Sequence, residues 1–212
     1  MGLPLRHQET GFTYADYLTW PEGERWEIID GQAYAMSPAP TNVHQWIVGE
    51  LFRHIANYFH GKSCRPFVAP FDVRLPNVRV KAGVNAVVND HDIDTVVQPD
   101  ISLVCDPNKL KDNHGCLGAP DWVIEVLSPS TAVHDQRIKR ALFERHGVPE
   151  YWLVHPVDRS VTIYRLVNNE NDEYGQPLIH GVGDIWSPLA FADLGIAVAD
   201  IFGDLPPMDV DA

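Results

Sequence analysis

The chain has 212 residues, 45% of them hydrophobic, and a formal net charge of −13 from 29 acidic and 16 basic residues. This length and apolar content suffice for one well-packed domain and argue against a disordered chain. The acidic balance argues against a protein held on DNA by a broad basic surface. It leaves room for a nucleic-acid enzyme with a local basic groove and a divalent metal at its centre.

Cysteine usage and hydropathy indicate the compartment. Cys64, Cys105 and Cys116 are isolated and lack CxxC spacing. An odd count excludes a complete disulfide framework, and a reducing cytoplasm is the simplest setting for three thiols. The N-terminus has no signal-peptide core, and no apolar run approaches the ~20 residues that span a bilayer. We therefore expect a soluble, cytoplasmic protein with no membrane contact.

The chain is predicted to form a single domain over residues 12–203. Residues 1–11 are expected to be a loose, flexible tail, and residues 204–212 a C-terminal tail. At the start of the domain, Thr13 can cap a short helix that runs through Leu18.

A β-hairpin is predicted next. Residues 25–29 have strand character, Asp30-Gly31 is a strong turn signal, and residues 32–36 can return as the second strand. Glu27 is an acid on a partly apolar face of this hairpin. A salt bridge to Arg25 or exposure to solvent is its ordinary explanation.

A long amphipathic helix is predicted from about His44 to His60, with Thr41 or Asn42 as its cap. Its apolar residues recur at four-residue intervals and should face the core. They are Ile47, Leu51, Ile55 and Phe59. We expect His44 to be neutral and to make a turn contact rather than bind a metal, whereas Glu50 can point into a site or into water.

The middle of the chain is predicted to contain two further strands. Residues 71–75 alternate apolar and charged side chains, as in a half-buried strand, and residues 77–92 are expected to form an extended connection or β-excursion. Residues 101–105 form an apolar strand, and Pro99 before it should lie at a strand start or bulge, a feature common beside active sites. Residues 106–119 are expected to form a loop.

The apolar run at residues 122–127 carries one acid, Glu125, at its centre. Such a run predicts a strand buried on both faces, where a carboxylate is costly unless it is paired or binds a metal. Glu125 is therefore a candidate site residue. Pairing with a core Arg, or a place on a half-exposed strand, would also explain it.

A helix is predicted after this strand, over about residues 133–145. Asp135 and Lys139 lie four residues apart in it and should share one face. The remaining predicted segments are strands at 151–154 and 161–166, a polar stretch at 168–183 with a possible small hairpin, and apolar cover over 185–202.

Asp100, Glu125 and Lys139 together suggest a chemistry. Two carboxylates converging on one point suit Mg2+ or Mn2+, which can polarise a phosphodiester and lower the pKa of a bound water. A nearby Lys can position that water and offset charge on the phosphorus. Two acids are a weak signal by themselves, because the pair Pro120-Asp121 shows how readily such a pattern arises by chance.

Short segments with distinctive sequences follow one another over about residues 12–166. They are Phe12-Thr-Tyr-Ala-Asp-Tyr-Leu18, Trp26-Glu-Ile-Ile-Asp-Gly31, Met36-Ser-Pro-Ala-Pro40 with His44, Gln98-Pro-Asp-Ile-Ser102, Pro120-Asp-Trp-Val-Ile-Glu-Val-Leu-Ser-Pro-Ser-Thr131, Asp135 with Lys139, and Gly147-Val-Pro-Glu-Tyr-Trp152. Their content and order resemble the Uma-type family of restriction-endonuclease-like proteins, in the PD-(D/E)XK nuclease superfamily.

The resemblance implies an α/β (α+β) restriction-endonuclease-like fold, with a mixed central β-sheet flanked by helices. It also implies that Asp100 and Glu125 are ligands of Mg2+ or Mn2+ and that Glu27 is a supporting acid at the same site. The expected activity is endonucleolytic hydrolysis of phosphodiester bonds in DNA.

One position departs from the superfamily pattern, which requires a Lys two residues after the Glu. This chain has Leu127 there, on the same side of the strand as Glu125. Lys139 is the natural substitute, at a spacing that Asp135 can support. The ordinary alternative is that Asp135 and Lys139 form a surface ion pair worth about 0.3–0.5 kcal/mol.

Two other functions remain open. A non-catalytic relative could bind a protein or nucleic acid through the same site, as the negative charge and Leu127 would allow. A zinc hydrolase using His44, His54 or His60 has little support, because their spacing places them on different helix faces and no HExxH is present.

A nuclease of this charge would reach DNA through a narrow basic groove, through a partner, or as a homodimer. The candidate groove residues are Arg53, Lys62, Arg137 and Arg140.

Overall fold

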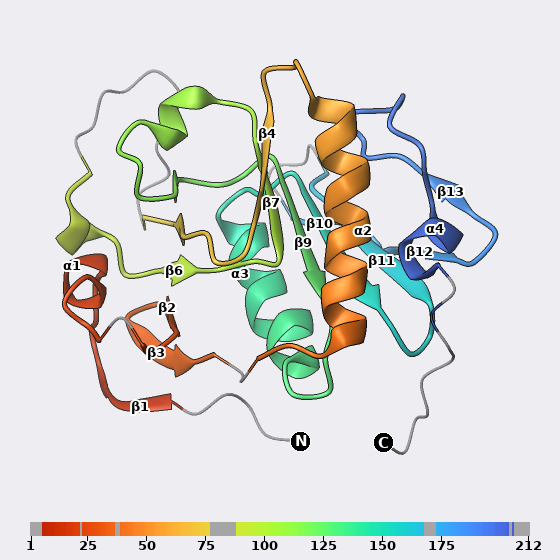
Figure 1. Cartoon of the computed structure of the whole chain (residues 1–212). Coiled ribbons are helices and arrows are strands. Elements are labelled where there is room, and N and C mark those ends of the chain that lie inside the picture. Colours follow the sequence, from red (N-terminus) through yellow and green to blue (C-terminus); the bar gives the residue numbers. More distant parts are fainter. Residues whose placement is uncertain are drawn as a thin grey trace.

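The protein is built from two six-stranded β-sheets and a small two-stranded ribbon (Figure 1). The helices pack mainly on one of the six-stranded sheets, which we call the central sheet. A computed structural model describes residues 6–21, 23–36, 39–76, 88–167, 173–203 and 205. The strands are β1 (Arg6–Thr10), β2 (Trp26–Ile29), β3 (Gln32–Ala35), β4 (Arg65–Val68), β5 (Val73–Arg74), β6 (Val96–Val97), β7 (Ile101–Val104), β8 (Cys116–Leu117), β9 (Trp122–Val126), β10 (Glu150–His155), β11 (Ser160–Arg165), β12 (Leu178–Gly181), β13 (Ile185–Trp186) and β14 (Ile196–Ala197). The helices are α1 (Tyr14–Tyr17), α2 (Asn42–Phe59), α3 (Arg140–Arg145) and α4 (Val198–Phe202), with helical turns of other types at η1 (Asp90–Asp92), η2 (Pro107–Leu110) and η3 (His134–Lys139).

The central sheet has the order β12-β11-β10-β9-β7-β4. It is mixed, because β9 and β10 run parallel while the other neighbouring pairs are antiparallel. Glu125 lies opposite Leu153 in the parallel pair. The two central strands are β9, predicted as a buried apolar run, and β10, predicted as a strand, and β9 is buried along its whole length.

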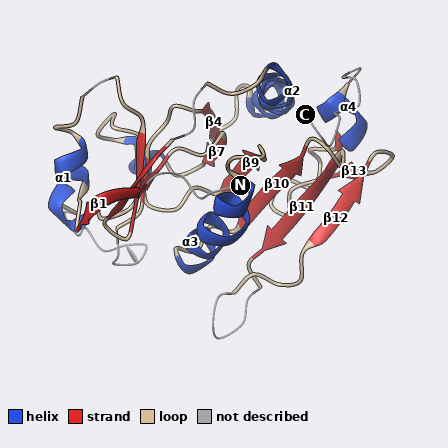
Figure 2. Ribbon diagram, turned by 90° about the horizontal axis from the view of Figure 1, so that it is seen from below, coloured by secondary structure: helices blue, strands red, loops and turns tan. Residues whose placement is uncertain are grey.

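Helices cover both faces of the central sheet (Figure 2). The helix α2 packs on one face, where its predicted stripe of Ile47, Leu51, Ile55 and Phe59 joins Ile124 and Trp152 in one apolar core. On the opposite face, Leu142 and Phe143 of α3 pack against Val123 and Leu153. Alternation along β9 therefore sends Ile124 toward α2 and Glu125 toward the side of η3 and α3.

The other six-stranded sheet has the order β1-β3-β2-β6-β5-β8 and is made of strands that are shorter on average. Its β2–β3 hairpin confirms the turn predicted at Asp30-Gly31, where both residues have positive φ. Residues Arg6–Thr10 were expected in a loose tail; they instead form β1 and pair with β3. Thr13 caps α1 as predicted, through a capping box with Asp16.

Other sequence expectations are corrected in detail. In the segment 71–75 only Val73 and Arg74 form a strand, and both are buried. Val73 belongs to the apolar core, and the charge of Arg74 is paired with Asp112. The loop predicted over 106–119 contains η2 and β8. Residues 77–87, expected to be extended, lie outside the described part of the chain.

The cysteines are paired, contrary to the expectation of three free thiols. Cys64 and Cys105 form a disulfide, and Cys116 is free and buried. The bridge follows from strand register, because Arg65 of β4 lies opposite Val104 of β7 and so brings the two flanking cysteines together. The inference of a reducing compartment therefore loses its basis. Separately, none of the helices in the described residues is long and apolar enough to cross a membrane.

Candidate active site

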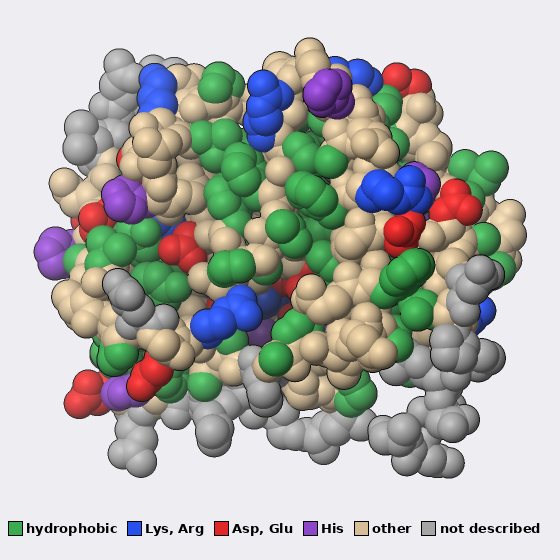
Figure 3. All heavy atoms as spheres, in the orientation of Figure 1, with side chains coloured by type: hydrophobic (Ala, Val, Ile, Leu, Met, Phe, Trp, Pro, Cys, Tyr) green, Lys and Arg blue, Asp and Glu red, His purple; other side chains and the backbone are tan. Residues whose placement is uncertain are grey.

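A cavity of about 410 Å3 opens where the β2–β3 hairpin meets β9, η3 and the start of α2. Its lining contains four carboxylates and one ammonium group. They are Glu27, Asp100, Glu125, Asp135 and Lys139. In Figure 3, acidic, basic and histidine side chains gather in a hollow of this face, between the hairpin and the lower end of α2.

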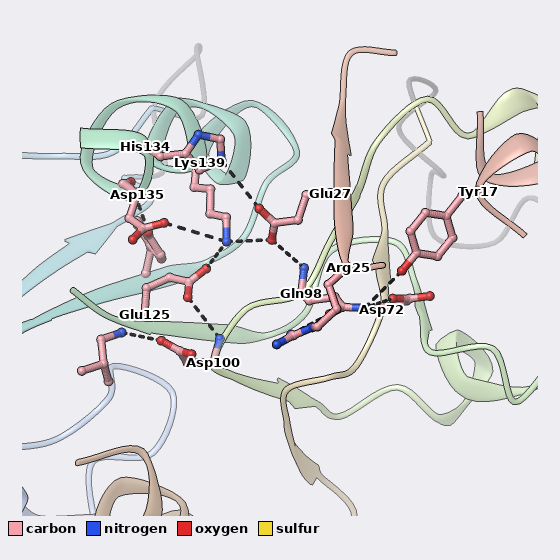
Figure 4. A network of polar contacts seen from close by, with 12 residues as sticks. Tyr17, Arg25, Glu27, Asp72, Gln98, Asp100, Glu125, His134, Asp135 and Lys139 are labelled. Carbon is pink, nitrogen blue, oxygen red and sulfur yellow. Dashed lines mark hydrogen bonds and ion pairs between the residues drawn. The ribbon is translucent and has the colours of Figure 1, made fainter. Parts of the chain in front are cut away.

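Lys139 is the centre of the polar cluster in this cavity (Figure 4). Its Nζ lies 2.7 Å from Glu125 Oε1, 2.8 Å from Glu27 Oε1 and 3.8 Å from Asp135 Oδ1. Lys139 is itself buried. The ammonium group therefore joins acids from β2, β9 and η3, and the pair Asp135–Lys139 is part of a buried network rather than a surface ion pair.

The helix predicted over 133–145 begins as a π-helical turn, η3, and continues as α3. This wider turn carries His134, Asp135 and Lys139, all three of them buried. A π-helical turn inside a longer helix is found frequently at functional sites. Here it directs three polar side chains toward the cavity while α3 supplies the apolar packing.

Glu27 is buried, and its contacts differ from those expected. Its Oε1 accepts a hydrogen bond of 2.9 Å from the backbone N–H of Gln98, and its Oε2 lies 3.6 Å from His134 Nε2. The expected salt bridge is made with Lys139 rather than with Arg25, whose guanidinium donates instead to Gln98 Oε1. Glu27 is thus brought into the same cluster as Glu125.

Asp100 and Glu125 each accept a hydrogen bond from a backbone N–H at or next to the other. The N–H of Asp100 donates to Glu125 Oε2 over 3.1 Å, and the N–H of Val126 donates to Asp100 Oδ2 over 2.8 Å. Asp100 Oδ2 also lies 3.1 Å from His44 Nε2. The geometry requires the irregular segment at Pro99, because this segment places Asp100 just before β7, next to β9.

His44 therefore contacts a site residue, which corrects the expectation of a neutral imidazole in a local turn. Burial lowers the pKa of His44, but the hydrogen bond and charge of Asp100 outweigh it and raise the pKa above 6.5. The cap of α2 is Thr41, whose side chain accepts from the N–H of His44 and so fixes this end of the helix.

The cluster has more acidic than basic groups, and the pKa values reflect this excess. Burial raises the pKa of Glu125 well above 4.5; Lys139 opposes this shift, while Asp100, Asp135 and Glu27 add to it. Burial likewise raises the pKa of Asp135 to about 6, against the opposing charge of Lys139. A cavity with this excess of carboxylates favours additional positive charge.

Glu27 and Lys139 are shifted toward their charged forms. Burial alone would raise the pKa of Glu27, but Lys139 and His134 outweigh it and lower the pKa to about 2. Burial would lower the pKa of Lys139, but Glu125, Glu27 and Asp135 raise it well above 10.5. Lys139 is therefore an ammonium ion at neutral pH.

The donor atoms suit a hard divalent cation. Carboxylate oxygens of Asp100 and Glu125 are the ligands that Mg2+ and Mn2+ prefer, and Mg2+ is often held by one or two carboxylates, with water and phosphate completing its shell. In the described part of the chain, no group of three or more His, Cys, Asp and Glu side chains is arranged to hold a metal. Two carboxylates would thus rely on water or substrate oxygens for the other positions.

Leu127, in the place of the superfamily Lys, is 8% exposed and belongs to the apolar core under α3. A cation at this position would have to enter that core. Lys139 reaches Glu125 from the neighbouring element instead, so the cavity gains its ammonium group from η3.

Several sequence candidates lie outside the cavity. Glu50 pairs with Arg53, and none of the four candidate groove residues belongs to the cavity lining. They are Arg53, Lys62, Arg137 and Arg140. His54 contacts Arg53 on the exposed side of α2, and His44 is the member of the proposed zinc set that lines the cavity. The zinc alternative therefore has no structural basis in the described residues.

The cavity residues that were not identified as candidates from the sequence include Arg25, Gln98 and His134. His134 precedes Asp135 on the same turn, and Gln98 belongs to the segment Gln98-Pro-Asp, so proximity to known candidates was the available signal. Arg25 was considered only as a partner for Glu27.

Comparison with known families identifies the chain. The family model of Uma2, described as "Putative restriction endonuclease", matches residues 14–199. The chain belongs to the Uma2 family. It is 29% identical over 160 residues to the uncharacterized protein slr1290 of Synechocystis sp., covering 74% of this chain and 75% of that protein.

A crystal structure from Anabaena variabilis, described as a putative nuclease belonging to DUF820, is similar to this Uma2 chain. The TM-score is 0.67 at 22% identity, and the match covers 90% of this chain and 97% of that one. This likeness, with the mixed sheet flanked by helices, confirms the restriction-endonuclease-like fold.

Proposed function

We propose that this Uma2 protein is a metal-dependent endonuclease that hydrolyses phosphodiester bonds in DNA, with Asp100, Glu125, Lys139 and Glu27 as its functional residues. The observation that carries the proposal is the contact of Lys139 with both Glu125 and Glu27 beside Asp100. These residues come from β2, β9, η3 and the segment just before β7, and a purely structural role would not require three carboxylates within 4 Å of one buried ammonium group.

Asp100 and Glu125 are the residues that would hold Mg2+ or Mn2+. Their oxygens face a cavity with an excess of carboxylates, and all hydrogen bonds of the Asp100 carboxylate to described residues use Oδ2, which leaves Oδ1 for another ligand. The ion would supply polarisation of the phosphodiester and a lowered pKa for a water molecule.

Lys139 acts in this proposal as a fixed positive charge. An ammonium group has three donors, and the two short contacts with Glu27 and Glu125 use two of them. The third can donate to a phosphate oxygen and offset charge that develops in the transition state. Because its pKa is raised, Lys139 does not serve as a general base at neutral pH.

Glu27 keeps Lys139 in position. It is itself fixed by the backbone N–H of Gln98 and by His134, so it can hold the ammonium group from the side opposite Asp135. Glu27 thus supports the site without being required as a metal ligand.

The proposal is tested by cleavage assays on single-stranded and duplex DNA, with RNA for comparison, in Mg2+ and in Mn2+. Asp100→Asn, Glu125→Gln and Lys139→Met should each lose cleavage by a factor on the order of a hundred or more, because the first two weaken the binding of the metal ion and the third removes the positive charge at the phosphate. Glu50→Gln is the matched control, since this acid is paired with Arg53 outside the cavity. Intact substrate with the wild-type protein in both metals would overturn the proposal.

The second candidate, a non-catalytic relative acting as a binding or interaction module, is favoured by the short contacts that already engage Lys139 with two acids. Calorimetric titration with Mg2+ and Mn2+ separates the two functions. Metal binding that is lost in Asp100→Asn and Glu125→Gln supports the nuclease; a wild-type protein that binds neither metal but retains DNA or protein partners supports the module.

A further inference from the structure

Arg25 lines the cavity together with Lys139, but no acid among the described residues balances its charge. Among the described residues, Arg25 and Lys139 are the two Lys or Arg side chains in the lining. Lys139 lies within 4 Å of three carboxylates, whereas Arg25 makes no ion pair with any described residue and is solvent-exposed. Arg25 is therefore the cation with capacity for a new anionic ligand.

The guanidinium of Arg25 is held at one point. Its NH2 group donates to Gln98 Oε1 over 2.9 Å. A guanidinium has five N–H donors in a rigid plane, and this contact leaves the others available for the two oxygens of a phosphate. An Arg placed for this purpose differs from a Lys, which binds phosphate as a point charge.

Gln98 is in turn fixed by its other contacts. Its Nε2 donates to Asp72 Oδ1 over 2.8 Å and to the hydroxyl of Tyr17 over 3.2 Å. Because Nε2 faces these two acceptors, Oε1 must face Arg25. Figure 4 shows Arg25, Gln98, Asp72 and Tyr17 on one side of Glu27, with Lys139 on the other.

Gln98 also connects Arg25 to the acidic residues Glu27 and Asp100. The backbone N–H of Gln98 donates to Glu27 Oε1, and Gln98 is separated from Asp100 by one proline. Arg25 and Glu27 are two residues apart in an extended segment, so their side chains leave the backbone on the same side. The orientation of Arg25 is thereby coupled to the position of Glu27 and Asp100.

We infer that Arg25 binds a phosphate of the nucleic-acid backbone next to the scissile one, and that Gln98 is the residue that positions it. This inference rests on the proposed nuclease function and names the group by which an acidic protein holds its substrate. It places the phosphate contact inside the cavity, not on the outer basic residues such as Arg53.

The test measures binding of a fluorescein-labelled DNA oligonucleotide, single-stranded and duplex, by fluorescence anisotropy at several salt concentrations in Ca2+, which takes the same oxygen ligands. Arg25→Ala should weaken binding about tenfold and reduce the slope of log affinity against log salt by about one. Arg25→Lys should recover part of the affinity, because the charge remains and the planar fork is lost. Arg53→Ala should bind as the wild type does.

Kinetics in Mg2+ or Mn2+ test the role of Gln98. Arg25→Ala and Gln98→Ala should each raise KM with little change in kcat, and the double variant should be no worse than Arg25→Ala alone, because both changes disable one contact. Additive losses would assign Gln98 a structural role only. Gln98→Ala retains the backbone bond to Glu27, and a thermal unfolding scan checks that the variant is folded.

The outcomes distinguish the two proposals. Wild-type binding and cleavage with an unaffected Arg25→Ala variant, or equal losses in Arg25→Ala and Arg53→Ala, would overturn the inference and leave the nuclease intact. Binding without cleavage would overturn the nuclease, and the Arg25→Ala comparison would still decide whether Arg25 contacts a backbone phosphate. A wild-type protein that neither binds nor cleaves DNA would overturn both.

Discussion

Lys139 and Glu27 show how a buried charge is tolerated in this protein. An isolated ion in an apolar interior costs several kcal/mol, and it persists when a partner and further hydrogen bonds compensate. Lys139 has two carboxylates at 2.7 and 2.8 Å, and Glu27 adds a backbone donor. Lys139 and Glu27 are therefore stable in their charged forms, while burial and the neighbouring acids raise the pKa values of Glu125 and Asp135.

The lowered pKa of Glu27 predicts a dependence of stability on pH. Its pKa falls from an ordinary 4.5 to about 2 on folding, which corresponds to about 3 kcal/mol. A group with a lowered pKa stabilises the fold above its unfolded value, and the contribution is lost as the pH falls from about 4.5 to about 2. Glu27→Gln should therefore reduce the free energy of unfolding at pH 7 and show less acid dependence.

Urea unfolding of both proteins at several pH values checks this prediction. The difference between them should be greatest near neutral pH and should shrink below pH 4.5, the ordinary value. Glu50→Gln, at an exposed pair, should leave the curve close to that of the wild type. A constant difference between wild type and Glu27→Gln at every pH would contradict the assignment.

At the scale of elements, α2 and η3 place the two sides of the site. The helix α2 is anchored in the core by its apolar stripe, and its first turn brings His44 to Asp100. Thr41 defines where that turn begins, because its side chain accepts from the N–H of His44. The position of His44 thus depends on a cap as well as on packing.

Thr41→Ala should lower the free energy of unfolding by about 1 kcal/mol, the usual value of an N-cap hydroxyl. Chemical denaturation measures the change. Thr19→Ala is the comparison, since this exposed Thr is not the N-cap of a helix and its hydroxyl donates to Asp16 O; its effect should stay within about 0.5 kcal/mol. Equal effects of the two substitutions would show that the cap does not stabilise α2.

At the scale of the molecule, the disulfide connects the segment after α2 to the end of β7. Cys64 and Cys105 are 41 positions apart in the sequence, and a bridge closing a loop of this size is expected to stabilise the fold by about 2–4 kcal/mol. The doubly substituted variant Cys64→Ser/Cys105→Ser should unfold at correspondingly lower denaturant concentration.

Thiol titration of the unfolded protein provides the direct measurement. One reactive thiol, from Cys116, is expected without reductant, and three after reduction. A reductant should destabilise the wild type and leave the double variant unchanged. Three thiols in the oxidised protein would contradict the bridge.

The sequence was sufficient to predict the hairpin, α2, β9 and the meeting of Asp100, Glu125 and Lys139. These follow from local signals, namely a turn pair, a periodic stripe and an acid in an apolar run, supplemented by the family resemblance. Glu27 was assigned the wrong partner because Arg25 is near in sequence, whereas Lys139 is near only after η3 packs against β2.

The cysteine interpretation was wrong for a related reason. Counting thiols says nothing about which strands become neighbours, and the pairing of Cys64 with Cys105 depends on the register of β4 against β7. Arg25 and Gln98 were overlooked because neither has an unusual local pattern. Their significance lies in a contact between segments 73 residues apart, which no short window of sequence contains.

The mutual backbone bonds of Asp100 and Glu125 have a practical consequence for mutagenesis. The backbone N–H of Asp100 donates to the Glu125 carboxylate, and the N–H of Val126 donates to the Asp100 carboxylate. Deleting either side chain therefore leaves one of these backbone N–H groups without its acceptor. An alanine substitution at either position would therefore remove one carboxylate and also displace the other, and the measured loss would combine the two effects. Carboxamide replacements keep one acceptor oxygen for the backbone N–H while they remove the charge, so they are the better variants at these two positions.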